Sequence, residues 1–538
     1  MTPPSPSEGH ARLDDPADLL DARTDPAAWE FGANGSEAGS DLNWLALVTT
    51  RVQERAAASG RHRWWVLSAL LAGLLALNFT FTVFIVALPK VAAEFHTSTT
   101  VLTWTMIGPL LAYGLAAPLF GKVGDVFGHR RLYLVGLLGA MVSAVLTALA
   151  PTAGILILAR TLDGVQGAAT GTASMALIMS SFPANERVKA MGWWSLVGAG
   201  GPVLGMSIGS PIIQYFGWRA LFWMQLVLLV LALCVVVIVL PRRAAAAGPV
   251  DRAEAVRAFR SMDWIGSWSL SLSVTTLMLG LSLGHAIGWV SPGTLACWVA
   301  TVVGVIVFVR RIRTSPNPLI PPAYFARRNF SLPIVLRCSS NFAYFGAFFL
   351  APLVMELGYG FSITKVGLVS IARPLTFAIC SPIAGYAAVK IGERTSAIVG
   401  TAALCASMLL FASLQPSTPL LWLIAALALS GFAMGAAMPA TSSIMANVVR
   451  EEDFGVMSAA QILAMQVGEV AGIQVLATLQ QEIMHHRGLT TDAAAAQLLG
   501  TFRIPFLVGA GLAGVSLTAA VCLRAAPRGA LAVATVEA

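Results

Sequence analysis

The chain has 538 residues, of which 57% are hydrophobic and only 11% are charged. Because ordinary soluble proteins carry about 25% charged residues, this composition argues against a soluble enzyme, a disordered chain and a nucleic-acid-binding protein. The mean hydropathy of +0.76 points instead to an integral membrane protein. The formal net charge of +8 follows from the placement of the basic residues along the chain.

Residues 1–60 differ from the rest, because they are rich in Pro, Ser and Asp and hold ten of the 26 acidic residues. This composition predicts a mostly disordered tail. Asp41 can cap a short helix over 41–57, whose apolar face around Trp44 would lie on the membrane surface. A plain soluble linker is the alternative interpretation of this stretch. A second tail is expected over 524–538.

From Trp64 onward, apolar runs of about 20 residues alternate with short polar joints. A bilayer core needs about 20 apolar residues per helix. The pattern predicts an all-α integral membrane protein with fourteen transmembrane helices. These helices are expected near residues 64–88, 101–120, 131–150, 153–178, 189–213, 218–240, 264–285, 293–310, 331–356, 364–386, 395–413, 418–445, 455–479 and 503–523.

The basic residues indicate how the helices are oriented. Alternate joints between the apolar runs carry 24 Lys and Arg residues, whereas the opposite joints carry only five. Basic residues concentrate in cytoplasmic loops. We therefore expect a multi-pass protein of the bacterial inner membrane with both termini in the cytoplasm, and the same asymmetry accounts for the net charge.

One internal repeat divides the chain into halves. Residues 121–130 and 385–394 share a Gly, a second Gly seven residues later and an Arg two residues after that. The repeat predicts a six-helix bundle over 64–240, a loop with two inserted helices over 241–330, and a second six-helix bundle over 331–523. Two equivalent bundles favour alternating access around a site at the middle of the membrane.

At these motifs the sequence resembles the fourteen-helix drug:proton antiporter branch of the major facilitator superfamily. Residues 121–131 resemble its signature loop between helices two and three. The segment from Arg160 to Gly164 resembles the helix-four signature, with Asp163 in place of the usual Gln. Residues 263–289 resemble the inserted helix of the branch. Helix one departs from the pattern, because Thr80 stands where the branch usually has an acid.

The resemblance implies roles for two further groups of residues. In the signature loop, the glycines permit a tight turn, and the acid could bind a helix N-terminus or an Arg across the bundles. Simple topology control by the basic residues is the alternative. The gating residues would be Gly121, Asp125, Gly128 and Arg130. The helix-five packing motif would be Gly201, Pro202 and Gly205.

Few ionisable residues lie at membrane depth, and such residues are costly unless they face a cavity or a partner. Asp163, Arg373 and Glu469 each lie about ten residues from an outer helix end, roughly 15 Å deep at 1.5 Å per residue. Arg160 can pair with Asp163, three residues later on one helix face. Arg337 is about two turns from a cytoplasmic end and is expected to snorkel to the surface.

We expect Glu469 to carry the proton, because it has no basic residue one turn away on its own helix and low dielectric favours its neutral form. A static Glu that holds helices together is the alternative. Asp163 is the secondary candidate, and its pairing with Arg160 is equally consistent with a structural role. Arg373 is expected to partner Glu469, or else to bind an anionic substrate.

Aromatic and amide side chains cluster in helices one and nine, which are equivalent in the repeat. If they face inward, they form an apolar wall for lipophilic or cationic compounds; if they face outward, they meet lipid. The candidate cavity residues are Asn78, Thr80, Phe81, Phe84, Asn341 and Phe345.

The sequence thus predicts a monomeric secondary transporter that exports small lipophilic or cationic compounds in exchange for protons. No enzymatic activity, cofactor, metal site or nucleic-acid partner is expected. Two alternatives remain at this stage. One is an uncoupled or importing transporter of an anionic solute or lipid, and the other is a membrane sensor or scaffold that does not transport.

Overall fold

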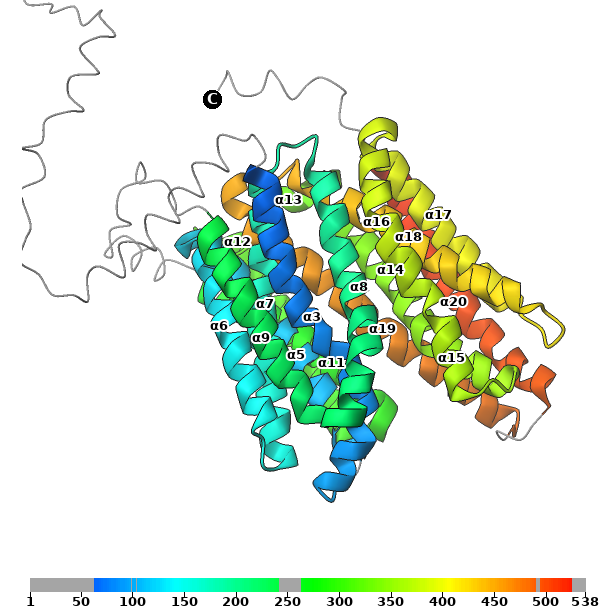
Figure 1. The fold of residues 1–538 in the computed structure, drawn as a ribbon. Helices are drawn as coiled ribbons and strands as arrows, with labels where there is room; N and C mark the ends of the chain where they lie inside the picture. The colour runs from blue at the N-terminus through cyan, green and yellow to red at the C-terminus, as the bar shows by residue number, and fades with distance from the viewer. Residues whose placement is uncertain (1–61, 98, 103, 241–262, 490–493, 525–538) are drawn as a thin grey trace, which may run out of the picture. The chain divides into compact units, whose positions relative to one another are not determined.

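The computed structural model describes residues 62–97, 99–102, 104–240, 263–489 and 494–524. The tail over 1–60, its expected helix at 41–57, most of the loop before residue 263 and nearly all of the C-terminal tail lie outside these ranges. Every regular element within them is helical (Figure 1). This confirms the predicted all-α membrane fold.

Among the described residues, fourteen helices have 20 residues or more, and each expected membrane span falls on one of them or on one together with a short neighbour. They are α3 (His62–Glu94), α5 (Trp104–Phe127), α6 (His129–Ala148), α7 (Ala153–Ser181), α8 (Arg187–Phe216), α9 (Trp218–Val239), α11 (Trp264–Ile287), α12 (Pro292–Thr314), α14 (Arg328–Leu353), α16 (Ala372–Ile391), α17 (Glu393–Ala412), α18 (Leu420–Ala446), α19 (Phe454–His486) and α20 (Ala495–Cys522). Short elements connect them: α4 (Thr99–Leu102), α13 (Pro322–Ala326), η3 (Val354–Gly358), α15 (Ile363–Ser370) and η4 (Glu451–Asp453).

Twelve of the described helices are long and apolar enough to cross a membrane by length and composition. Helix α7 falls short because Arg160, Asp163 and Gln166 interrupt its apolar sequence. Helix α8 is also not among the twelve, and several of its side chains lie outside the described residues. Polar residues are tolerated in a membrane helix when they face the inside of a bundle.

The long helices pack in two groups whose contacts repeat. In the first group, α5 and α6 both pack on α7, and α3 packs on α8; in the second, α16 and α17 both pack on α18, and α14 packs on α19. The groups meet where α5 contacts α19 and where α16 contacts α8. Segment 121–130 runs from the end of α5 into α6, and segment 385–394 runs from the end of α16 into α17. The two copies of the sequence repeat therefore join corresponding helices of the two groups.

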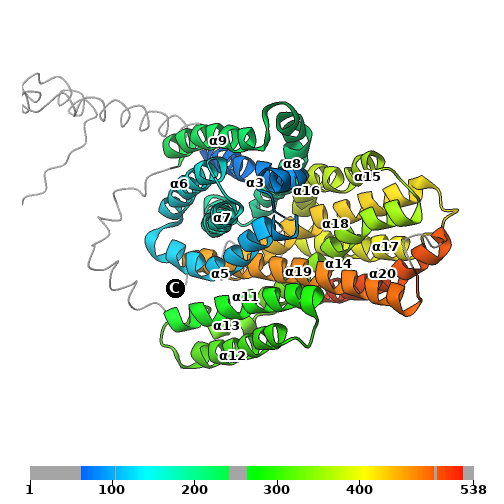
Figure 2. The same cartoon turned by 90° about the horizontal axis from the view of Figure 1, so that it is seen from below.

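Helices α11 and α12, over which the sequence predicts an inserted pair, lie side by side (Figure 2). Helix α11 packs against both α5 and α19, while α12 packs chiefly against α11. Asp263 caps α11 by accepting a hydrogen bond of 3.0 Å from the Gly266 amide, and it also pairs with Arg311 of α12 at 3.0 Å. This buried carboxylate therefore joins the start of one inserted helix to the end of the other.

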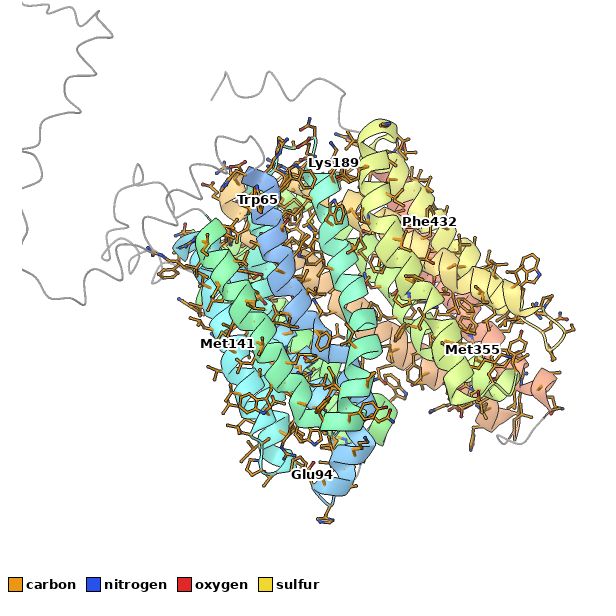
Figure 3. All side chains as sticks on the ribbon, viewed as in Figure 1. Trp65, Glu94, Met141, Lys189, Met355 and Phe432 are labelled. Carbon is orange, nitrogen blue, oxygen red and sulfur yellow. The ribbon has the colours of Figure 1, made fainter. Side chains whose placement is uncertain are left out.

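The outer faces of the helices are apolar. Leu158 is 69% exposed, and Val227, Val299 and Ile383 are exposed in the same way. Burial of apolar surface is favourable at about 25 cal/mol per Å², so these faces are suited to lipid and not to water. Figure 3 shows Lys189 near one end of the helices and Glu94 near the other; we call these the Lys189 end and the Glu94 end.

Candidate functional site

Helix α7 carries a buried polar cluster. Arg160 is 2% exposed, and its Nη1 donates to Oδ2 of Asp163 at 2.8 Å. The amide of Gln166 donates to the other carboxylate oxygen of Asp163 at 2.6 Å. The spacing of three residues places all three side chains on one helix face, so the expected pair of Arg160 and Asp163 exists, and Gln166 is a third member that sequence reasoning missed.

Aromatic rings surround the Arg160 guanidinium. It lies 5.5 Å from the ring centre of Phe84 in α3 and 5.8 Å from that of Phe222 in α9. A cation above an aromatic face is stabilised by the ring quadrupole. Phe84 is fully buried at this position, so it packs on a charge of the protein itself, in the first helix group.

Arg373 in α16 has a similar setting in the second group. Its guanidinium lies 5.2 Å from the ring of Tyr344, 5.6 Å from that of Phe411 and 5.8 Å from that of Phe348. It donates to Ser430 Oγ at 2.9 Å and to the Tyr344 carbonyl at 3.4 Å. Its Nη2 atom is buried without a hydrogen-bond partner among the described residues.

Glu469 lies in the middle of α19 and is partly exposed. Among the described residues, its carboxylate makes no hydrogen bond or ion pair, and the expected pairing with Arg373 is not present. Arg373 instead lies over the Tyr344 ring and donates to Ser430 and to the Tyr344 carbonyl. The two carboxylates at membrane depth therefore differ in their surroundings. Asp163 is paired and hydrogen-bonded, whereas Glu469 has no such partner among the described residues.

Arg337 corrects an expectation. Its side chain does not snorkel, because the residue is 4% exposed and lies between α14, α18 and α19. It donates to Ser442 Oγ at 2.9 Å and to Gln461 Oε1 at 3.1 Å, and Ser442 donates to the same Gln461 oxygen at 2.8 Å. The number of residues from the helix end gives the depth of a side chain in the membrane but not the face of the helix on which it lies. For this reason the predicted snorkelling of Arg337 was wrong.

The joint after α5 contacts the second helix group. The Asp125 carboxylate accepts hydrogen bonds from the backbone amides of Gly455 at 2.7 Å and Val456 at 3.1 Å, in the first turn of α19. His129 lies 3.1 Å from the same carboxylate. Helix N-termini carry unpaired amides and a partial positive charge, so Asp125 supplies both the acceptors and the negative charge that this terminus needs.

The other expected gating residues surround this contact. A Cβ at Gly121 would lie 2.7 Å from the Gly455 carbonyl and 2.8 Å from the Ala459 side chain, so only glycine permits this approach. Gly128 has φ of 92°, a left-handed conformation that favours glycine. Arg130 Nε donates to the Leu240 carbonyl at 3.1 Å, within the first group.

The second inter-group contact was not anticipated as a site. Arg187 donates to Asn447 Oδ1 at 3.2 Å and to Glu451 at 3.4 Å, across the two groups. A Cβ at Gly385 would lie 2.8 Å from the Val188 carbonyl, and one at Gly192 would lie 2.7 Å from the Ser381 carbonyl. Gly385 is the counterpart of Gly121 in the sequence repeat, and this was the signal that could have predicted the contact.

The helix-five motif packs α8 on α3. A Cβ at Gly201 would lie 3.0 Å from the Asn78 Cβ, and one at Gly205 would meet the carbonyl of Phe79 directly. Small residues allow such close approach of membrane helices. The side chain of Pro202, the third residue of the motif, lies outside the described residues.

The six candidate cavity residues have different surroundings. Thr80 is 1% exposed and Asn341 is 1% exposed, and the Thr80 hydroxyl and Asn341 Oδ1 are buried without hydrogen-bond partners among the described residues. Asn78 and Asn341 donate to carbonyls of their own helices, Leu74 at 2.9 Å and Arg337 at 2.7 Å. Phe345 packs edge-on against Tyr344. The side chain of Phe81 lies outside the described residues.

Comparison with known proteins gives a consistent result. A family model described as Major Facilitator Superfamily matches residues 69–364 and again residues 334–536. The puromycin resistance protein pur8 of Streptomyces alboniger is 30% identical over 434 residues, which cover 79% of this chain and 84% of that protein. The tetracenomycin C resistance and export protein of Streptomyces glaucescens is 27% identical, with 77% and 76% covered.

A third relative and two solved structures extend the likeness. The multidrug efflux pump LfrA of Mycolicibacterium smegmatis is 28% identical, with 84% of this chain and 88% of that protein covered. The human organic anion transporter MFSD10 (TETRAN) superposes with a TM-score of 0.59 at 18% identity, covering 84% of this chain and 99% of that one. The proton:xylose symporter XylE gives a TM-score of 0.58 at 14% identity, with 84% and 95% covered, and at these identities the likeness concerns the fold alone. The chain therefore belongs to the Major Facilitator Superfamily, as a multi-pass membrane transporter that resembles its drug-resistance and efflux members.

Proposed function

We propose that the protein exports small lipophilic or cationic compounds across the bacterial inner membrane in exchange for protons, by alternating access. Relatives over most of the chain are named as drug resistance and export proteins. Proton coupling is supported by a contrast between two carboxylates. Asp163 is bound to Arg160 and Gln166, whereas Glu469 has no such partner in the described residues.

The contrast supports Glu469 as the carrier of the exchanged proton. The charged form of a carboxylate is costly in a low dielectric unless it is paired. Asp163 has that compensation from Arg160 and Gln166, whereas Glu469 can bind a proton when its surroundings are dry and release it when water or a cationic compound arrives. Exchange then follows, because a proton and a cationic substrate neutralise the same carboxylate in turn.

Unpaired polar atoms near the two equivalent helices support a binding site there. The Thr80 hydroxyl in α3 and Asn341 Oδ1 in α14 are buried and lack partners in the described part of the chain. An unsatisfied buried polar group costs about 1–3 kcal/mol, so each is suited to a hydrogen bond with water or substrate. We infer that these two groups and Phe345 contribute to the substrate site, whereas the Phe84 ring is packed against Arg160.

The proposed cytoplasmic side is the Lys189 end, where the basic joints gather. The contacts of Asp125 with α19 and of Arg187 with Asn447 join the two helix groups there. Lys189 also lies 5.7 Å from the Tyr386 ring across the groups. We infer that these contacts close the cytoplasmic gate and must break before a compound can enter from the cytoplasm.

A second candidate function rests on the buried arginines. Arg373 and Arg337 have only neutral hydrogen-bond partners among the described residues. A buried cation without a counter-ion could bind the anionic group of a solute. The alternative function is therefore uncoupled transport of an organic anion.

One experiment separates the two functions. The gene is expressed in a bacterial host that lacks its own efflux pumps, and the accumulation of a panel of cationic, neutral and anionic fluorescent compounds is measured with and without a protonophore. Proton-coupled export predicts lower accumulation of cationic or neutral compounds, and loss of this effect with the protonophore. Protonophore-insensitive movement of anionic compounds alone would favour the second function.

A further inference from the structure

A groove of about 540 Å³ lies along the seam between α14 and α20, away from the buried charges. Its lining is apolar except for one hydroxyl and one thiol. The residues that define it are Leu332 and Val335 of α14, and Gly511, Gly514, Thr518 and Cys522 of α20. The groove therefore opens on the surface of the helices that faces the hydrocarbon of the bilayer.

The missing side chains of two glycines form the groove. A Cβ placed at Gly511 or at Gly514 would meet no atom within 4 Å, whereas one at Gly472 of α19 would meet the Phe342 backbone. These two glycines are therefore not required for helix packing. Instead they leave space for a molecule that is not part of the chain.

The length of the groove matches one leaflet. Gly511 and Cys522 are eleven residues apart in α20, which is about 16 Å at a rise of 1.5 Å per residue. Half of the hydrocarbon core of a bilayer is about 15 Å thick. The groove therefore accommodates the extended part of an acyl chain from a single leaflet.

Two arginines lie at the adjoining ends of the helices that line the groove, since Arg328 begins α14 and Arg524 follows the end of α20. Arg328 precedes Leu332 by four residues and Val335 by seven, so it shares their face of α14, and it is exposed. Arg524, also exposed, follows α20, and its backbone is held to the first turn of α14 through Asn329 by hydrogen bonds of 2.9 and 3.0 Å. Neither arginine side chain has an ion pair within the described residues.

We propose that this groove binds an anionic phospholipid of the cytoplasmic leaflet, with one acyl chain along Gly511 and Gly514 and its phosphate between Arg328 and Arg524. The assignment to that leaflet rests on the proposed orientation of the helices. The apolar length selects a lipid chain over a soluble anion, and the arginines select an anionic headgroup over a zwitterionic one.

The test uses the full chain in detergent, with native mass spectrometry to count bound phosphatidylglycerol and phosphatidylcholine at equal concentrations. The wild type is expected to retain phosphatidylglycerol preferentially. Each of Arg328→Gln and Arg524→Gln should weaken phosphatidylglycerol binding by about fivefold, the contribution of one basic residue at an anionic surface. Gly514→Leu and Gly511→Leu should reduce binding of both lipids, because a side chain fills the groove.

Matched controls lie outside the groove, on other helices. Arg313→Gln removes an exposed arginine at the end of α12, and Gly154→Leu fills open space in the first turn of α7; both should bind lipid as the wild type does. Equal binding of the two lipids by the wild type, or unchanged binding by both groove-filling variants, would overturn the proposal. A dimer that Gly514→Leu dissociates would also overturn it, since a second copy of the chain would then occupy the groove.

Discussion

Asp125 at the end of α5 accepts a hydrogen bond of 2.7 Å from the backbone amide of Gly455 in the first turn of α19. Val456 donates to the other carboxylate oxygen at 3.1 Å. The two helices belong to different helix groups. A single carboxylate therefore accepts two hydrogen bonds from the N-terminus of a helix in the other group. In the proposed alternating-access cycle, opening of this end would break both hydrogen bonds.

We predict that Asp125→Asn inserts normally but transports poorly. The amide keeps the shape but loses the negative charge at the helix N-terminus, an interaction of up to about 2 kcal/mol when partly buried. A loss of that size changes the balance between closed and open gates by up to about thirtyfold. The measurement is the export rate in cells, together with the labelling of single cysteines near α19 from the cytoplasmic side.

Glu356→Gln is the control for the gate, because Glu356 is an exposed acid in η3, in the joint that follows α14. It should transport at the wild-type rate. A wild-type export rate in Asp125→Asn would leave the signature loop with a role in membrane orientation only.

Two glycines of α8 give a matched pair for packing. Gly205→Ala places a methyl group against the Phe79 carbonyl of α3, whereas Gly198→Ala meets nothing within 4 Å. Overpacking costs about 1–3 kcal/mol, so Gly205→Ala should lower the thermal unfolding midpoint of the purified protein by several degrees. Gly198→Ala should leave it unchanged or raise it slightly, because alanine favours helix more than glycine does. Equal midpoints for the two variants would contradict the close contact of α3 and α8.

The pair of Arg160 and Asp163 is expected to stabilise the fold. Asp163→Asn leaves the buried guanidinium without its counter-charge, and breaking a buried pair costs about 3 kcal/mol or more. The expected result is lower thermal stability, with proton coupling less affected than by changes at Glu469. In the double variant Arg160→Leu/Asp163→Leu, most of the stability should return because no uncompensated charge remains. If Asp163→Asn were as stable as the wild type, the pair would not have a structural role.

The Arg337 network predicts a coupled effect. Gln461→Leu removes an acceptor shared by Arg337 and Ser442, and a hydrogen bond to a charged group contributes about 1.5–3 kcal/mol. The single variant should therefore be less stable than Arg337→Leu/Gln461→Leu. Additive losses in the double variant would show that the two side chains do not interact energetically. Unfolding by heat or denaturant in detergent, followed by tryptophan fluorescence, measures both.

Much of the fold could be predicted from local sequence features. Hydropathy placed fourteen helices because a membrane helix needs about 20 predominantly apolar residues in a row. The motif shared by residues 121–130 and 385–394 predicted that α5 and α16 are equivalent helices. In the structure α5 packs on α7 and α19, and α16 packs on α18 and α8. The spacing of Arg160 and Asp163 predicted their contact because it depends only on the geometry of a single helix.

The side-chain partners between helices could not be predicted in this way. Gln166 completes the Asp163 site, Arg337 is buried where a snorkelling side chain was expected, and Arg187 reaches Asn447 in the other group. These contacts depend on the rotation of each helix about its axis and on which helices become neighbours. Hydropathy and charge counts along the chain carry no direct information on either.

Glu469 is proposed to carry the exchanged proton. The most direct measurement is proton release when a transported compound is added to purified protein in weakly buffered detergent, recorded across pH. The wild type is expected to release protons in a pH-dependent manner, as is the control Glu482→Gln, which removes an exposed acid farther along α19. Glu469→Gln is expected to release none while still binding the compound. Undiminished, pH-dependent release from Glu469→Gln would contradict the assignment and move the proton to Asp163.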